Sequence, residues 1–533
     1  MTRKSHIFSH VLSALVLSGL FAASPASAET LSEALVAVYN KNPQLLAARA
    51  QLREVDENYI QARAQGRFSV TASGQYSRSV LKGSGIGSGQ SFGQGDIPTE
   101  MPAGATPDNL FYYAPSAAQI EIVQPLYQGG RIRALKAQAK AGILAQRESL
   151  RATENQLFLA GANAYLDVQQ AEEASRIRRN NVRVLSRQLE AANERFDVGV
   201  GTKTDIAQSG ARLAAAEAGL AQAEAALQSA RASYERVVGR MPVDLQPVPQ
   251  FVTPQTLGEA IELARQNNPQ LIASYFNEEA GDAAIGVAKA AGRPTISLNG
   301  NVAAQRGQLF GFEQSEAAEI TAQISIPIFS GGLNSSRVRQ AEHAKTRLGF
   351  ESRDRERAVD EAIRQIWAQR DAARATLVSG QKQVEAAEIA FEGVSLELEV
   401  GSRTQLDVLD AEQELLNAKL SLLEAKRNLN ASTFQLLSTI GVFDSEGIRL
   451  ELERPYDTHE NLETVRNDGL TRIVDKIVPS PVQKAADSIT KTVETGVVKV
   501  ETQLYEAPGA PNIEPADSVS KENSPKPEPR DRP

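Results

Sequence analysis

The 533-residue chain is mildly acidic, with 57 Lys and Arg residues against 65 Asp and Glu residues, for a formal net charge of −8. This balance offers no basic surface to nucleic acid, so no nucleic-acid partner is expected. The absence of cysteine excludes disulfides, a thiol nucleophile, a cysteine-based metal site and a lipid-anchored N-terminal cysteine.

The first residues are typical of an export signal. Arg3 and Lys4 precede an apolar run over residues 11–21, and the small residues that end at Ala28 fit a cleavage site. We therefore expect a signal peptide over residues 1–28 and a mature chain that begins with glutamate. The apolar run is shorter than the roughly 20 residues of a membrane-spanning helix, and no later segment comes closer.

The mature chain contains one long unit twice. LSEALVAVYNKNPQL, which begins at Leu31, returns as LGEAIELARQNNPQL at Leu257, a shift of 257 − 31 = 226. PLYQGG at Pro125 returns as PIFSGG at Pro327, a shift of 327 − 125 = 202 that then stays constant to the end of the unit. Two ungapped copies over such a length predict an internally duplicated fold.

The repeats divide the rest of the chain into five predicted parts. These are a first structural repeat over 29–240, a linker over 241–256, a second repeat over 257–441, a C-terminal equatorial segment over 442–477, and a tail over 478–533. The tail is rich in Pro, Glu, Lys and Ser, a composition that predicts disorder.

In each repeat the hydrophobic period changes from helical to alternating and back to helical. In the first repeat the alternation predicts a strand pair over about 68–78 and 117–125, and we expect the second strand to end at Pro125, which donates no ladder hydrogen bond. The second repeat carries the corresponding pair over about 294–303 and 318–327.

The connection within the first strand pair is the longer one. From Gly74 to Pro125 there are 125 − 74 = 51 positions, but from Gly300 to Pro327 only 327 − 300 = 27, an excess of 24. The excess is rich in Gly, Ser and Pro over residues 82–107 and predicts a long surface loop. No helix follows these glycines directly, so they form no phosphate-binding fingerprint.

A helical hairpin is predicted after each strand pair, over about 131–238 and 333–440. Long proline-free stretches rich in Ala, Glu and Gln are interrupted by Gly199 and Gly201 in the first copy and by Gly401 in the second, where the chain turns back. The returning helices carry apolar residues at every seventh position, which indicates a left-handed coiled-coil seam.

The four predicted strands need more than one chain. Alternating strands of this length match the roughly 9–11 residues of a tilted membrane-crossing barrel strand. Four strands cannot close, because open edges in lipid leave backbone groups unsatisfied and known single-chain barrels begin at about eight strands. Several chains should share one barrel. The alternatives are a small soluble sheet packed on helices, or a soluble coiled coil that leaves the strands without a role.

Three groups of motifs together resemble one protein family. The repeated NPQL segments, the PLYQGG and PIFSGG strand ends, and VGSRTQLDVLDA over 400–411 are similar to those of the TolC-like outer-membrane efflux proteins, over about residues 30–441. The resemblance implies an α+β membrane protein, in which a homotrimer forms a twelve-stranded β-barrel in outer-membrane lipid. Its antiparallel helical hairpins would form an α-helical tunnel through the periplasm of a Gram-negative bacterium.

The resemblance also implies a function. It predicts a passive exit duct of a tripartite efflux or type I secretion system. The partners would be a periplasmic adaptor (membrane fusion) protein and an energised inner-membrane transporter of the ABC, RND or MFS class. The cargo stays open between small toxic compounds and secreted proteins, because the wall of a duct need not recognise what passes through it.

Two acidic residues match the family's periplasmic gate. Asp407 and Asp410 fall on the positions of its inward-facing acidic rings, and their spacing of three puts both on one helical face. With threefold symmetry they would form two rings of carboxylates that concentrate cations. The alternative is a pair of solvated charges at a hairpin tip. In the first repeat Gln208 stands opposite Asp410, so only the second carries the acidic pair.

Four more residues match positions that tie neighbouring hairpins together in the closed family fold, namely Arg403, Thr204, Asp205 and Gln188. The match is incomplete, because the partner position of Asp205 holds Leu398 and that of Gln188 holds Ser395. Only the link from Arg403 to Thr204 carries over intact, so we expect a closed state with fewer polar ties.

An enzyme is not predicted. After the signal only His343 and His459 remain, and no recognised catalytic or phosphate-binding motif occurs, so we expect no catalytic residue, cofactor or metal. The alternative to a duct is a trimeric outer-membrane protein with a structural or adhesive role, which would conduct nothing.

Overall fold

A computed structural model of the chain describes residues 28–82, 110–306 and 314–467. Nearly all of the Gly-rich 82–107 segment, the 478–533 tail and the signal peptide up to residue 27 therefore lie outside the described residues. The elements of the first repeat are α1 (Leu31–Lys41), α2 (Pro43–Ala64), β1 (Ser69–Tyr76), β2 (Ser79–Lys82), β3 (Leu110–Tyr113), β4 (Ser116–Gln128), α3 (Arg131–Asp197) and α4 (Lys203–Val238). Those that follow are α5 (Leu257–Asn267), α6 (Pro269–Ala290), β5 (Thr295–Arg306), β6 (Gln314–Ser325), α7 (Leu333–Glu399), α8 (Gln405–Ile440) and α9 (Glu460–Asn467).

The repeated Asn-Pro pair marks a helix junction in both copies. Asn42 ends α1, and its side chain accepts a hydrogen bond from the backbone N–H of Gln44 in α2. Between α5 and α6 the side chain of Asn268 accepts from the backbone N–H of Leu271, and a proline occupies the first turn of each second helix. Proline fits there because the first helical N–H groups have no partner within the helix. The repeated motif is therefore a capping device.

The principal sheet has the order β1-β4-β5-β6, with every neighbouring pair antiparallel. Ser69 pairs with Val123 in the first copy and Thr295 pairs with Ser325 in the second. These pairs differ by the two sequence shifts, since 69 + 226 = 295 and 123 + 202 = 325. The duplication therefore extends to the register of the strands. The short strands β2 and β3 form a separate two-stranded sheet.

The prediction that the second strand ends at Pro125 is wrong. β4 continues to Gln128, with a register irregularity between Pro125 and Tyr127. β1 pairs with β4 only as far as Val123, so beyond that point β4 has a single neighbour, β5. A proline is tolerated there because an edge strand does not need every N–H in a ladder.

The strands of the second copy also differ from their predicted bounds of 294–303 and 318–327. β5 and β6 extend to meet each other at Arg306 and Gln314, and β6 ends at Ser325, two residues before Pro327. The two repeats thus end their second strands differently, because β4 has a partner beyond its proline and β6 is the last strand of the sheet.

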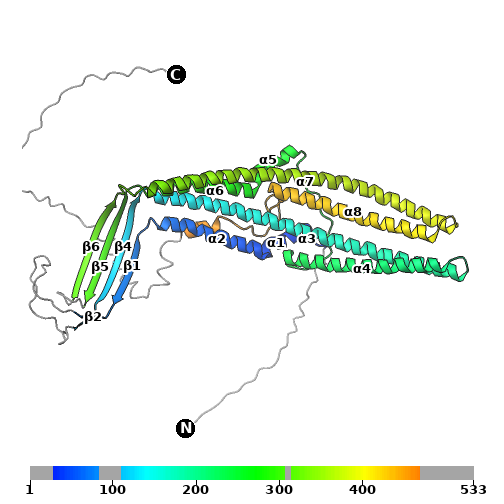
Figure 1. Cartoon of the computed structure of the whole chain (residues 1–533), viewed down its shortest axis with the longest axis horizontal. Helices are drawn as coiled ribbons and strands as arrows, with labels where there is room; N and C mark the ends of the chain where they lie inside the picture. Colours follow the sequence, from blue (N-terminus) through cyan, green and yellow to red (C-terminus); the bar gives the residue numbers. More distant parts are fainter. Residues whose placement is uncertain (1–27, 83–109, 307–313, 468–533) are drawn as a thin grey trace, which may run out of the picture. The chain divides into compact units, whose positions relative to one another are not determined.

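The long helices form two hairpins, α3 with α4 and α7 with α8, which contact each other through α3 and α8. Both turns use a glycine with positive φ, +80° at Gly199 and +78° at Gly401, a conformation that L side chains rarely adopt. In Figure 1 the four-stranded sheet lies at one end of the helices and the two turns lie at the other.

The shorter helices flank the long ones unequally. α6 contacts both α3 and α7, whereas α2 contacts α3 but has no comparable contact with a second long helix of the described chain. Since α2 and α6 are equivalent in the two repeats, one flank of α2 is left without the partner that α6 has.

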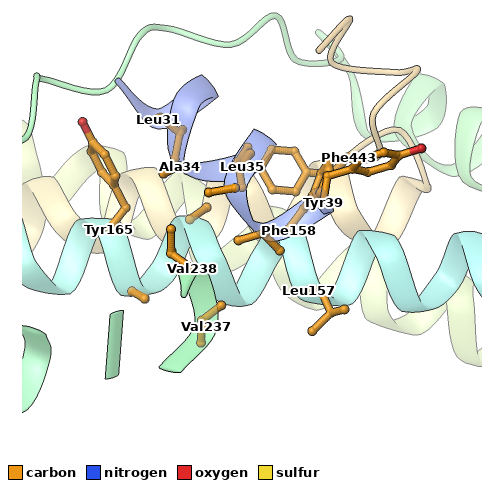
Figure 2. Packing of buried hydrophobic residues seen from close by; sticks show 14 of the residues in the cluster. Leu31, Ala34, Leu35, Tyr39, Leu157, Phe158, Tyr165, Val237, Val238 and Phe443 are labelled. Atoms are coloured by element: carbon orange, nitrogen blue, oxygen red, sulfur yellow. The ribbon is translucent and has the colours of Figure 1, made fainter. Parts of the chain in front are cut away.

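The main hydrophobic core lies where α1 and the segment after α8 pack on α3 and α4 (Figure 2). Phe158 of α3 is fully buried, between Tyr39 of α1 and Phe443, with ring centroids 6.4 Å and 6.5 Å away. Burying a side chain of this size contributes about 1.5–3 kcal/mol. This core joins α1, near the start of the described residues, to the end of the second repeat. None of the described helices is both long and apolar enough to cross a membrane.

Replacing Phe158 by alanine should lower the stability of the helical region. Phe→Ala substitutions in a packed core typically cost about 3–5 kcal/mol, because a cavity remains. The full-length protein should therefore melt at a clearly lower temperature when helicity is followed by circular dichroism. Val252→Ala, at a side chain that is 94% exposed, is the matched control and should leave the melting temperature unchanged. Equal melting temperatures for both variants would contradict the assignment of this core.

Candidate functional site

The candidate site comprises the two turns at which the helical hairpins reverse, together with the adjoining first turns of α4 and α8. Gly199 and Gly201 lie in the first turn and Gly401 in the second. A Cβ atom at Gly201 would lie 2.9 Å from the backbone nitrogen of Phe196, so the chain closes tightly there. At the equivalent position the second turn has Arg403, so the two turns are not the same in chemistry.

Asp407 caps the first turn of α8. Its carboxylate accepts hydrogen bonds from the Thr404 backbone N–H at 2.9 Å and from the Thr404 hydroxyl at 2.8 Å, while its own N–H donates to the hydroxyl oxygen at 3.3 Å. These bonds, with a smaller effect from the positive charge of Arg403, hold the pKa of the Asp407 carboxyl below its ordinary value. Asp407 is therefore charged at neutral pH.

Asp205 has the same role in the first repeat. Its carboxylate accepts from the Thr202 N–H at 2.9 Å and from the Thr202 hydroxyl at 2.8 Å. Each hairpin thus restarts with a capping box of threonine and aspartate. Asp407 and Asp205, for which the family resemblance implies a role at the gate, also hold the backbone of the turns.

Asp410 is partly exposed and is paired across the hairpins. Its carboxylate lies 2.7 Å from a guanidinium nitrogen of Arg212 on α4. The side chains are 58% and 40% exposed, so solvent screens the pair and it adds little stability. Its main effect is to place one positive charge beside each Asp410. Sequence reasoning did not identify Arg212, because its partner is 198 positions away.

Arg403 is bound within its own hairpin. Its Nε donates to Glu397 Oε2 at 2.9 Å across the turn, and this bond raises the pKa of the guanidinium. Thr204 is exposed, and the part of the chain that the structure describes contains no hydrogen bond between it and Arg403. The link from Arg403 to Thr204 therefore stays a prediction, to be tested between chains.

Gln188 lies in a contact between the hairpins. Its side-chain oxygen accepts a hydrogen bond from Gln405 Nε2 at 3.1 Å, and the Gln405 oxygen in turn accepts from Arg195 Nη1 at 2.6 Å. Ser395, at the position of the missing carboxylate partner, donates instead to the carbonyl oxygen of Phe391 in its own helix. Gln188 thus finds a partner on α8 of the same chain.

About two turns further into the helices, α3 and α8 share a buried polar pair. Asn181 Nδ2 donates to Glu412 Oε1 at 2.9 Å, and the two residues are 9% and 5% exposed. Burial raises the pKa of the Glu412 carboxyl to about 7, against the opposing effect of the Asn181 hydrogen bond. Glu412 lines an open groove of about 610 Å³ between the hairpins.

Gln188 belongs to a set of five polar residues with a regular spacing, and sequence reasoning missed the other four. Asn181, Gln188 and Arg195 recur every seven positions on α3, and Gln405 and Glu412 do so on α8. We call these five residues the polar ladder. Residues seven positions apart lie on one face of a helix, whether they are polar or apolar. A search for apolar residues at this spacing does not detect polar residues that have the same spacing. Among residues 28–82, 110–306 and 314–467, no cluster of three or more His, Asp or Glu residues is placed to hold a metal ion.

Comparisons with known proteins agree in one family. The model of the outer membrane efflux protein family matches residues 34–240 and 260–442. Outer membrane efflux protein BepC of Brucella suis biovar 1 is 30% identical over 461 residues, which cover 86% of this chain and 95% of BepC. Alkaline protease secretion protein AprF of Pseudomonas aeruginosa is 25% identical over 351 residues, 63% of this chain and 72% of AprF.

Solved structures have the same fold. The crystal structure of the Campylobacter jejuni CmeC outer membrane channel superposes with a TM-score of 0.64 at 17% identity, over 82% of this chain and 89% of that chain. At this identity the likeness shows the fold alone. The TolC-like α+β architecture expected from the sequence is confirmed, whereas the trimer and the shared barrel stay predictions.

The capping box of α8 makes a local prediction. Thr404→Ala removes the hydroxyl that pairs with Asp407, and loss of such a cap typically weakens the helix end by about 1 kcal/mol, or about fivefold in its opening equilibrium. Hydrogen exchange followed by mass spectrometry should show faster exchange in the first turn of α8 and an unchanged exchange rate in α4. Thr346→Ala, within α7, is the control and should leave this turn unaffected. Unchanged protection in Thr404→Ala would show that the Thr404 hydroxyl does not stabilise the start of α8.

Proposed function

This chain belongs to the outer membrane efflux protein family and lies in the outer membrane of a Gram-negative bacterium, and we propose that it is the passive exit duct of a tripartite efflux or secretion system. In this proposal one chain is one part of a ring. Its sheet has an open edge on each side, and α2, which contacts α3 and the short helix α9, lacks the second long-helix contact that α6 has. Copies of the chain would close both.

The two outer strands of the sheet are open to strands of other copies. β1 and β6 each have one neighbour, so each presents an unpaired backbone edge. Ile328 and Phe329 lie beyond the end of β6 and are 94% and 88% exposed. Their counterparts in the first repeat, Leu126 and Tyr127, still belong to β4, at the register shift beside β5. These exposed residues fit a strand that continues only when β1 of another copy lies beside it.

The two equivalent short helices α2 and α6 have unequal contacts with the long helices. Within the chain, α6 packs between α3 and α7, whereas its equivalent α2 packs on α3. If α2 of one copy also packs on α7 of the next, every long helix gains the same surroundings. The same head-to-tail arrangement pairs β6 with the next β1. Such heterologous contacts form closed rings when the rotation closes.

The faces of the sheet fit a membrane barrel. Ile120 pairs with Val302, and Ile296 pairs with Ile324, so these apolar side chains share one face. The opposite face carries polar residues such as Glu121 and its partners. A barrel in lipid has an apolar outside and a polar interior. Three chains of four strands give twelve strands, the number that the family resemblance implies.

The gate proposal follows from the turns. Asp407 and Asp410 lie in the first two turns of α8, with Asp407 charged and Asp410 next to Arg212. In a ring of three chains they would form two rings of carboxylates at the periplasmic entrance and favour cations there. Because Arg212 partly neutralises the second ring, we expect Asp407 to contribute more to cation selectivity.

The partners proposed are a periplasmic adaptor and an inner-membrane transporter of the ABC, RND or MFS class. BepC, which is similar over most of both chains, is named an efflux protein, and AprF is named for alkaline protease secretion. The wider coverage of BepC favours efflux over the secretion of a protease.

The closure of the ring is testable with cysteines, because the chain has none of its own. Val123 pairs with Asn299 between the repeats. Applying the two shifts, 123 + 202 = 325 and 299 − 226 = 73, places Ser325 of one copy opposite Ser73 of the next. The variant Ser325→Cys with Ser73→Cys should form covalent dimers and trimers on oxidation, visible on a non-reducing gel.

The matched control is Ser325→Cys with Ser69→Cys. Its two sites would be four residues out of register, about 13 Å apart at the usual rise of a strand, so no cross-link is expected. Cross-linking in the control alone, or ladders that extend beyond three chains, would contradict the proposed ring.

Conductance tests the duct itself. The full-length protein in planar bilayers should conduct with a preference for cations, and Asp407→Asn with Asp410→Asn should reduce the preference, measured as the reversal potential in a salt gradient. Arg212→Gln should increase it, because it removes the charge that offsets Asp410. A structural or adhesive protein would show no conducting path in any of these variants.

A further inference from the structure

The two hairpins of one chain are held together differently along their length. Near the main core, α3 contributes buried apolar residues from Leu150 to Val168, and α8 contributes Phe434 and Leu437. Toward the turns, the contact between α3 and α8 instead includes the polar ladder. Buried polar contacts between helices specify one geometry rather than adding much stability.

Glu412 is the ladder residue whose hydrogen bonding is incomplete. One carboxylate oxygen is bonded to Asn181, and the other, Oε2, is buried without a hydrogen-bond partner among the described atoms. A charged carboxylate in this position is costly, because burial removes its water without supplying enough donors. The protonated form carries no charge and suits the packed contact better.

The charged groups around Glu412 are mostly occupied by other partners. On α3, Arg176 pairs with Glu173, and Arg183 donates to the side chain of Asn180. Across the groove, Lys419 of α8 pairs with Glu388 of α7. On α4, Arg212 pairs with Asp410. The remaining charged residues that line the groove are Glu392 of α7 and Lys426 of α8. Burial is the main cause of the Glu412 shift, and no neighbouring charge contributes to it.

We propose that Asn181 and Glu412 form a protonation-dependent latch, which positions the α7–α8 hairpin against α3 and thereby sets the separation of the Asp407 and Asp410 rings at the entrance. This inference deepens the proposed duct function and depends on it. Asn181 and Glu412 are positioning residues, since neither has to touch the cargo.

The direction of the pH effect follows from linkage. The packed contact raises the pKa of Glu412 from 4.5 to about 7, so packing favours the protonated carboxyl. The stabilisation is fully present below 4.5 and is lost as the pH rises through about 7. Between pH 5.5 and pH 8 the equilibrium of the latch should shift on the order of 20-fold toward the open form. An acidified periplasm would therefore favour a closed entrance.

Single-channel recording of the full-length protein tests the latch. The wild type should spend more time in its open level at pH 8 than at pH 5.5. Glu412→Gln, which keeps a neutral side chain of the same shape, should stay closed at both values. The matched control is Glu414→Gln, an exposed carboxylate on the same helix, which should keep the wild-type pH profile. Asn181→Leu removes the partner and should raise open time even at pH 5.5.

A distance measurement gives a second readout that does not need conduction. Spin labels on Arg187→Cys in α3 and Asn417→Cys in α8, with one labelled chain per assembly, should move apart between pH 5.5 and pH 8. The distance should not change with pH in the Glu412→Gln background. A conducting wild type whose open time and label distance ignore pH would overturn the latch and leave the duct intact. The opposite result is a protein that never conducts but whose label distance changes with pH, and does so only when Glu412 is present. That result would overturn the duct and leave the latch intact.

Discussion

The unpaired edges of β1 and β6 are the constraint on which the rest of the structure depends. A strand edge presents a row of N–H and C=O groups, and in a bilayer no water is available to satisfy them. If the four strands lie in lipid, as we propose, they therefore need strands from other copies. In such a ring the helices that continue from the strands would form a ring as well, and α2 of one copy would contact α7 of the next.

The duplication makes such a ring possible with a single chain type. Because both repeats use the same register, the junction between β4 and β5 inside the chain is a template for the junction between β6 and the next β1. The proposed ring would use two junctions between repeats: β4 with β5 within a chain, and β6 with β1 between chains. Only the first is complete in a single chain. This explains why β4 continues to Gln128 whereas β6 ends at Ser325.

Local patterns allowed much of the fold to be predicted from sequence. The hairpin expected over 131–238 consists of α3 and α4, which begin at Arg131 and end at Val238, because glycine breaks and capping residues act through near neighbours. Partners that lie far apart could not be predicted. The pair of Asp410 with Arg212, and that of Asn181 with Glu412, join separate helices whose rotation no single-chain pattern fixes. Pro125 misled for a related reason, since its effect depends on where β1 stops.

The repeats differ most where their hairpins meet. Arg195 of the first copy corresponds to Glu397 of the second, and Gly210 corresponds to Glu412, although the backbone of both hairpins is alike. Inside the chain the hairpins join mainly through α3 and α8, with a smaller contact of α4 on α8 that includes the pair of Arg212 and Asp410. Within the described residues α4 and α7 share no comparable contact with each other, so in the proposed ring they would meet between chains. A ring of identical chains would then alternate between two chemically distinct seams. In the proposed ring the polar ladder would belong to the seam within the chain, and the predicted link from Arg403 to Thr204 would belong to the seam between chains. The two seams would then respond to different conditions, so the entrance would open at one set of contacts while the other keeps the ring together.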